Sequence, residues 1–132
     1  MLVPANFSES LSDLYGKPYR LSASGEAYDC WTLIVEIYKR LGINVVDKVD
    51  YQSSFGSTAR SFAKAGTWER IDKPERGCLV LLYNNGSTCH VGFCIKSNKI
   101  FHALANKGVR MDNLKMIERI FTSAEYYLPC QN

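Results

Sequence analysis

The stretch GCLVLLYNNGSTCHVGFCIKSNKIFHAL, residues Gly77 to Leu104, decides the fold class of the chain. It contains three short apolar segments that have the length of strands, and none of them has the spacing of an amphipathic helix. Asn84-Asn85-Gly86 and Lys96-Ser97-Asn98 separate these segments and consist of residues that favour tight turns. The stretch therefore predicts neighbouring antiparallel strands.

Further strands are predicted on both sides of this stretch, at residues 67–71, 108–111 and 124–128. Helices are predicted only nearer the N-terminus: a short one within residues 5–19, capped by Ser8, a second over 28–42 and a third over 53–66. Helices followed by strands, without a βαβ alternation, indicate an α+β fold with an antiparallel sheet of about five or six strands. The length of 132 residues predicts a single domain over residues 1–132.

The composition argues against several classes of function. A net charge of +3 without a run of Lys or Arg does not suit a nucleic-acid-binding protein. Five cysteines, an odd number without the spacing of a disulfide framework, favour synthesis in a reducing cytoplasm. We see no secretory signal and no stretch long enough to span a membrane, so we expect another route to any extracellular site.

The predicted helix over residues 28–42, YDCWTLIVEIYKRLG, has a cysteine in its first turn. Asp29 is a suitable N-cap, and Gly42 is a suitable residue to end the helix. Cys30 lies on an apolar stripe, which is also typical of an ordinary packing cysteine. The helix start favours the thiolate, whereas the neighbouring carboxylate of Asp29 opposes it. A reactive Cys30 therefore needs a cationic partner, and histidine is the usual one.

The only two histidines of the sequence, His90 and His102, lie in neighbouring predicted strands. Alternation places His90 on one face together with Gly92 and Cys94, which leaves space beside the imidazole. Each histidine alone is as well explained by a structural role. Two histidines on adjacent strands, together with a cysteine at a helix start, favour catalytic chemistry.

The turn between the two strands decides whether the histidines share a face. A two-residue turn, Ser97-Asn98, places them on opposite faces. A three-residue turn that includes Lys96 and has a left-handed Asn98 places Cys94 opposite Ile100 and the two histidines diagonally across from each other. Diagonal neighbours are within reach, so the second register permits a line from Cys30 through His90 to His102.

A metal site is the competing interpretation of the same region. Its thiol and imidazole ligands would come from Cys78, Cys89, His90, Cys94 and His102. No pair has the short C-x-x-C spacing of structural zinc sites, and alternation places Cys89 and His90 on opposite faces. We therefore expect no metal or other cofactor, and we expect Cys89, Cys94 and Cys130 to be packing cysteines.

Three motifs resemble the NlpC/P60 family of papain-like cell-wall cysteine peptidases. They are GKPY at residues 16–19, YDCWTLIVEIYKRLGI at 28–43, and the stretch from Gly77 to Met111 with its HVG and HA strands and following GV. The resemblance covers Tyr15 to Met111 in the family's own order. It implies a papain-like fold with the cysteine helix packed on the sheet. It also implies hydrolysis of peptidoglycan stem peptides, commonly between D-glutamate and the following diamino acid.

The resemblance also implies roles for individual residues. Cys30 matches the nucleophile, His90 the general base and His102 the third residue of a Cys-His-His triad that acts through a thioester. Tyr19 and Asp29 are similar to residues that shape the substrate site, and Trp31 stands beside them in the turn where the family often has serine. The family's usual GD before the first central strand is GC here, at Gly77-Cys78.

The DCW form of the motif looks most like the family members attached to bacteriophage tails. This resemblance implies action at the bacterial cell wall as a virion component, with stem peptides as substrate and a tail or other delivery protein as partner. Two alternatives remain at this point. One is a related papain-like amidase or acyltransferase, and the other is a catalytically silent structural or binding component of a tail or injection machine.

Overall fold

The computed structural model describes residues 3–45 and 68–130, apart from the side chains of Ser87 and Thr88. The helical elements are the 3-10 helix η1 (Phe7–Leu11), α1 (Cys30–Arg40) and α3 (Leu114–Glu118). The strands are β1 (Trp68–Ile71), β2 (Leu79–Asn84), β3 (Ser87–Lys96), β4 (Lys99–Leu104), β5 (Gly108–Asn113) and β6 (Ser123–Pro129). The predicted helix over residues 53–66 lies outside the described residues.

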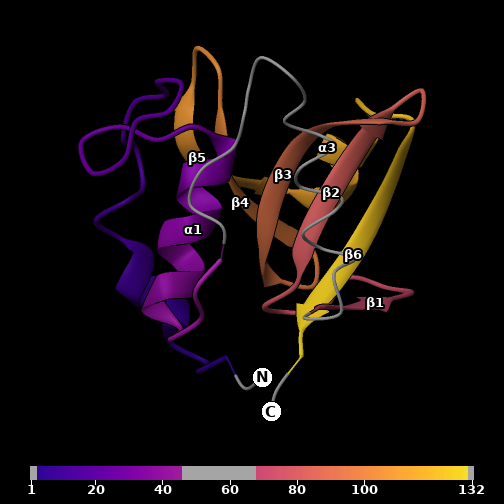
Figure 1. Cartoon of the computed structure of the whole chain (residues 1–132), viewed down its shortest axis with the longest axis horizontal. Coiled ribbons are helices and arrows are strands. Elements are labelled where there is room, and N and C mark those ends of the chain that lie inside the picture. The colour runs from indigo at the N-terminus through magenta and orange to yellow at the C-terminus, as the bar shows by residue number, and fades with distance from the viewer. Residues whose placement is uncertain (1–2, 46–67, 131–132) are drawn as a thin grey trace.

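All six strands form one antiparallel sheet in the order β1-β6-β2-β3-β4-β5. The helix α1 packs against β3 and β4, as Figure 1 shows, and α3 follows β5 and packs beside it. The helices and the antiparallel sheet confirm the predicted α+β class, and the number of strands is within the predicted range. The short helix α3, between β5 and β6, is not among the predicted helices. None of the described helices is long and apolar enough to cross a membrane.

The sheet has an apolar core on each face. The larger core fills the space between α1 and the sheet, and the strands supply side chains such as Val91, Phe93 and Ile95. The smaller core lies on the other face and includes Cys94 and residues of α3. The alternation predicted for β3 is therefore present, since neighbouring side chains of this strand enter different cores.

The helix α1 begins and ends where the sequence predicts. Asp29 is its N-cap and forms a capping box with Thr32, and Gly42 follows the helix with a φ of 81°. A left-handed residue at this place favours glycine and stops the helix. Six residues of α1 are buried: Cys30, Trp31, Leu33, Ile34, Ile37 and Tyr38. Burial of this face fixes the helix and its N-terminal cysteine on the sheet.

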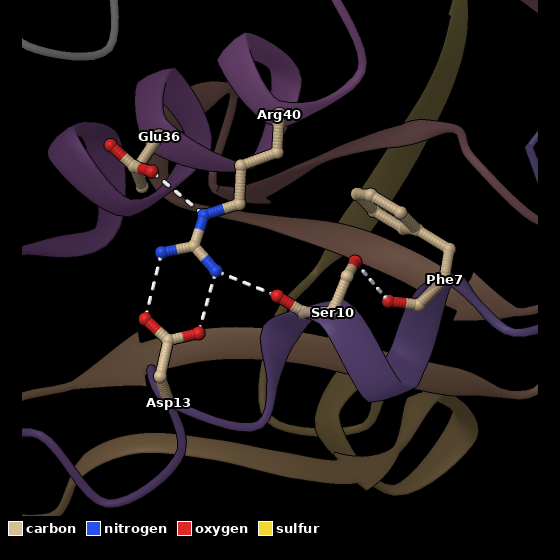
Figure 2. Close-up of polar contacts among 5 residues, drawn as sticks. All are labelled: Phe7, Ser10, Asp13, Glu36 and Arg40. Carbon is tan, nitrogen blue, oxygen red and sulfur yellow. Dashed lines mark hydrogen bonds and ion pairs between the residues drawn. The ribbon is translucent and has the colours of Figure 1, made fainter.

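The N-terminal segment differs from the prediction. It forms only a five-residue 3-10 helix, and its N-cap is Asn6, without a side-chain cap, so the prediction of Ser8 is wrong. Arg40 of α1 holds this segment in place, as Figure 2 shows. Its guanidinium donates to both carboxylate oxygens of Asp13, at 2.6 and 2.9 Å, and to the carbonyl of Ser10 at 2.7 Å. Its Nε donates to Glu36 at 2.7 Å.

The connection from β3 to β4 combines the two predicted turns. The turn itself consists of Ser97 and Asn98, because Lys96 pairs with Lys99, and Asn98 does not have the predicted left-handed backbone. A register shift between Cys94 and Lys96 adds the odd residue, so Cys94 still pairs with Ile100. The register that brings the histidines together is therefore present, but a bulge produces it.

The sheet opens between β3 and β4 beyond this hairpin. Within the described residues, pairing of the two strands extends from the turn only to Phe93 and Phe101. Toward its N-terminus β3 continues to pair with β2, and toward its C-terminus β4 continues to pair with β5. His90 and His102 both lie in the region where β3 and β4 no longer pair. This opening is where the first turn of α1 meets the sheet.

Candidate active site

Cys30 is the first residue of α1 and is 8% exposed. Burial, followed by the negative charge of Asp29, raises the pKa of its thiol to about 12. Hydrogen bonding by the backbone N–H groups of Val91, Cys30 and Trp31 opposes this rise. The helix start therefore favours the thiolate and Asp29 opposes it, as predicted, but burial outweighs the helix start. The thiol is neutral at neutral pH.

His90 and His102 are in direct contact. The Nε2 atom of His90 lies 2.8 Å from Nδ1 of His102, and the two rings meet edge to face with centroids 5.0 Å apart. His102 is completely buried and His90 is 7% exposed. The ring of Phe121 lies parallel to that of His90 at a centroid distance of 6.0 Å. The two imidazoles thus form one buried pair at the opening of the sheet.

Both imidazoles are neutral at neutral pH. Burial, followed by the neighbouring His102, lowers the pKa of His90 to about 3. Burial also lowers the pKa of His102, although a hydrogen bond to Asp112 opposes the shift. A buried imidazole without a full counter-charge loses more by protonation than one in water does. The site therefore holds a neutral thiol and neutral bases.

The sulfur of Cys30 lies at the backbone N–H of Val91, which is bonded directly to His90. Within the described residues, no hydrogen bond joins this sulfur to the His90 ring, and the Nδ1 atom of His90 has no partner. Tyr19 also lies beside the cysteine: burial, followed by the charges of Cys30 and Asp29, raises the pKa of its hydroxyl. The structure thus brings Tyr19, and the strand backbone next to His90, to Cys30 at the start of α1.

Asp29 and Trp31, which the sequence predicts in the substrate site, are both buried. Asp29 is completely buried, and one of its oxygens accepts from the N–H groups of Trp31 and Thr32 at 2.9 and 2.8 Å. The other oxygen accepts from the N–H of Ser22 at 2.7 Å. Trp31 is completely buried in the core between α1 and the sheet. Asp29 therefore caps the helix, and Trp31 stabilises the core.

Asp112 and Arg110 extend the histidine pair, and no motif in the sequence indicated them. Oδ2 of Asp112 lies 2.7 Å from Nε2 of His102, and Nε of Arg110 donates to the same oxygen at 2.9 Å. Both residues come from β5, and Arg110 pairs directly with His102. A hairpin register counted through the turn after Leu104 could have indicated this neighbourhood, because side chains two residues apart share a face.

The family model of the NlpC/P60 family matches residues 16–124 of the sequence. The chain belongs to the NlpC/P60 family. Members of this family are generally cysteine peptidases or amidases that act on peptidoglycan. Among curated proteins, none matches the sequence.

Solved NlpC/P60 structures have the same fold. The NlpC/P60 domain of the peptidoglycan hydrolase SagA matches with a TM-score of 0.67 and 16% identity, over 97% of this chain and 100% of that domain. An NlpC/P60 family protein from Bacillus cereus matches with a TM-score of 0.71 and 23% identity, over 98% of this chain and 42% of that one. A lipoprotein-like family member from Staphylococcus aureus matches with a TM-score of 0.68 and 16% identity, over 97% and 42%. The chain thus spans less than half of the latter two proteins.

The other four cysteines of this NlpC/P60 domain are two buried and two exposed residues. Cys78 and Cys94 are buried in the smaller core on the other face of the sheet, as expected for Cys94. Cys89 and Cys130 are exposed, so the expectation that they pack in the core is wrong. Among the described residues, no group of three or more His, Cys, Asp or Glu side chains could hold a metal ion.

Gly92 provides a first test of the close packing between β3 and β4. A Cβ atom at this position would lie 2.4 Å from Cδ1 of Ile100 and 3.3 Å from Cβ of His102. We expect Gly92→Ala to lower the free energy of unfolding in urea by about 1–3 kcal/mol, because the core must yield to the added methyl group. Combining it with Ile100→Ala should cost less than the sum of the two single changes. Additive losses would contradict this contact.

The neutral histidine pair predicts an unusual pH dependence. The unfolded chain binds protons on its two histidines below about pH 6.5, whereas His90 in the folded chain stays neutral down to about pH 3. The free energy of unfolding should therefore fall, as the pH drops from about 6.5 toward about 3, by up to about 1.4 kcal/mol per pH unit from His90 alone. In NMR spectra, the imidazole of His90 should not titrate between about pH 8 and pH 5, and His102 should titrate below its ordinary midpoint. A midpoint near the ordinary value for either ring would contradict the prediction.

Proposed function

We propose that this NlpC/P60 protein is a cysteine peptidase that hydrolyses the stem peptides of peptidoglycan. In this proposal Cys30 is the nucleophile, His90 the general base and His102 the residue that orients His90. The observation that carries it is the buried imidazole pair, with Nε2 of His90 at 2.8 Å from Nδ1 of His102, on a strand whose Val91 N–H meets the Cys30 sulfur. Membership of a family of peptidoglycan hydrolases supports the choice of substrate.

The neutral state of the site determines how the thiol is activated. Because the pKa of Cys30 is raised to about 12 and that of His90 is lowered to about 3, a resting ion pair is unfavourable. The proton therefore moves from the Cys30 sulfur to Nδ1 of His90 while the sulfur attacks the peptide carbonyl. This step requires the two side chains to approach within hydrogen-bond distance, as catalytic contacts do when substrate binds.

The remaining steps use the same groups. Backbone N–H groups at the start of α1, including that of Cys30, are candidate donors to the oxyanion of the tetrahedral intermediate. His90 returns its proton to the leaving amine, which leaves an acyl thioester on Cys30. His90 then takes a proton from water, the hydroxide attacks the thioester, and the thiol is regenerated. Tyr19, whose hydroxyl lies near Cys30, remains a proposed substrate contact.

Digestion of purified muropeptides, read by mass spectrometry, tests the proposed function. The parent protein should cut the bond between D-glutamate and the diamino acid, and Cys30→Ala should not. Cleavage at the junction of sugar and peptide would identify an amidase instead. Intact muropeptides after prolonged incubation, with folded protein, would favour a catalytically silent component and contradict the proposal.

Delivery by a bacteriophage tail or another delivery protein is a separate proposal. It is supported by the DCW motif at residues 29–31. We expect the chain to be found in purified tail particles of its source. Tails without the chain, in preparations whose other proteins are complete, would contradict this proposal and leave the peptidase proposal intact.

A further inference from the structure

The hydrogen bonds of the histidine pair continue beyond the three residues of the proposed mechanism. Nε2 of His102 lies 2.7 Å from Oδ2 of Asp112, and Arg110 donates its Nε proton to the same oxygen at 2.9 Å. His102 is completely buried, and the side chain of Asp112 is 19% exposed. The chain of contacts therefore runs from His90 through His102 to a carboxylate that an arginine holds.

The charge of Asp112 decides which groups carry protons. Burial opposes ionisation of its carboxyl, but hydrogen bonds from His102 and Arg110 outweigh burial, and the pKa of Asp112 is lowered. An ionised carboxylate can only accept hydrogen bonds. The proton between Asp112 and His102 therefore belongs to Nε2 of His102.

The proton on Nε2 of His102 determines which nitrogen of each ring is protonated. A neutral imidazole has one N–H and one bare nitrogen. Since the proton of His102 is on Nε2, its Nδ1 is bare and can only accept. The contact of 2.8 Å between the rings then requires the proton on Nε2 of His90. The bare nitrogen of His90 is Nδ1, which has no partner within the described residues.

We propose that Asp112, held by Arg110, is a positioning residue that fixes His90 in the tautomer with a bare Nδ1. This tautomer can accept the thiol proton of Cys30, whereas the other one presents a proton to the thiol and cannot. The catalytic meaning of the proposal depends on the proposed function, but the assignment of the protons does not. Without the carboxylate of Asp112, no fixed acceptor holds the proton of His102 on Nε2, so neither tautomer of the pair is favoured.

Nitrogen-15 NMR of histidine-labelled protein tests the proposal directly, because the sequence contains only two histidines. Long-range correlations separate protonated from bare ring nitrogens. In the parent protein at neutral pH, both rings should carry their proton on Nε2. In Asp112→Ala, a large fraction of both rings should move the proton to Nδ1. Asp112→Asn should retain more of the parent pattern, because the amide oxygen can still accept from His102 and Arg110.

Asp13→Ala is the matched control. It removes an aspartate that also pairs with an arginine, Arg40, but it lies outside the histidine pair (Figure 2). Its tautomers should equal those of the parent. If Asp112→Ala does not fold, the spectra of the parent protein and of Asp112→Asn still test the assignment of the protons. A proton on Nδ1 of His90 in the parent, or unchanged tautomers in a folded Asp112→Ala, would overturn the proposal.

The kinetic consequence is a loss in kcat on stem peptides of about tenfold to a hundredfold for Asp112→Ala, with little change in KM. An unchanged kcat together with shifted tautomers would overturn the catalytic role of Asp112. If the parent protein hydrolyses no stem peptide while the tautomers shift as expected, the proposed function fails and the proton assignment stands.

Discussion

Replacing Cys30 with alanine is expected to lower the rate of stem-peptide hydrolysis by at least about a thousandfold. Without the sulfur no thioester can form, and only binding and oxyanion stabilisation remain. Cys30→Ser should be nearly as inactive, because a hydroxyl is a far weaker nucleophile beside a base of lowered pKa. The measurement is the initial rate of release of cleaved muropeptide at equal protein concentration.

The control for this prediction is Cys130→Ala. Cys130 is exposed beyond the end of β6, whereas Cys30 is buried at the start of α1. The control variant should retain the parent rate, and both variants should unfold cooperatively as the parent does. A Cys30→Ser protein that cleaves as fast as the parent would show that another group makes the attack.

The second large effect is expected for His90→Ala, with a loss in kcat of about a hundredfold to ten-thousandfold. His90 is the only imidazole in the mechanism that exchanges protons with the thiol and the leaving amine, so its loss removes both transfers. His102→Ala should lose less activity, because the base remains and only its orientation is weakened. Rates of the two variants on the same muropeptide give the comparison.

Burial makes a stability control necessary for both histidine variants. His102 is completely buried and its removal leaves Asp112 without one partner, so this variant is expected to be the less stable. Its free energy of unfolding should therefore fall more than that of His90→Ala, although its activity falls less. A greater loss of kcat for His102→Ala in folded protein would exchange the proposed roles of the two imidazoles.

The secondary structure was largely predictable because local chemistry determines it. The N-cap at Asp29, the end at Gly42 and the turn residues of the strand region are short-range signals, and the structure agrees with them. The hairpin after Cys94 was less predictable. A bulge and a two-residue turn give the same pairing of Cys94 with Ile100 as a three-residue turn, so sequence spacing could not separate them.

The contact between His90 and His102 was predictable from the sequence, but the electrostatics around them were not. The raised pKa of Cys30 results from burial by the whole domain, which no local motif reveals. The motif predicts Trp31 in the substrate site, and its position on α1 buries it in the core. Asp112 comes from a strand outside the recognised motifs, and only the register of β4 with β5 brings it to His102.

The proposed mechanism depends most on a covalent bond between the substrate and Cys30. Trapping this bond tests the mechanism most directly. Protein mixed with stem peptide, quenched in acid within a turnover and mapped by mass spectrometry should carry the acyl fragment on the peptide that contains Cys30. Cys30→Ala protein should carry none. The opposite result is release of product by protein that never carries an acyl group on Cys30, although a model thioester survives the same quench. This result would contradict the proposed mechanism.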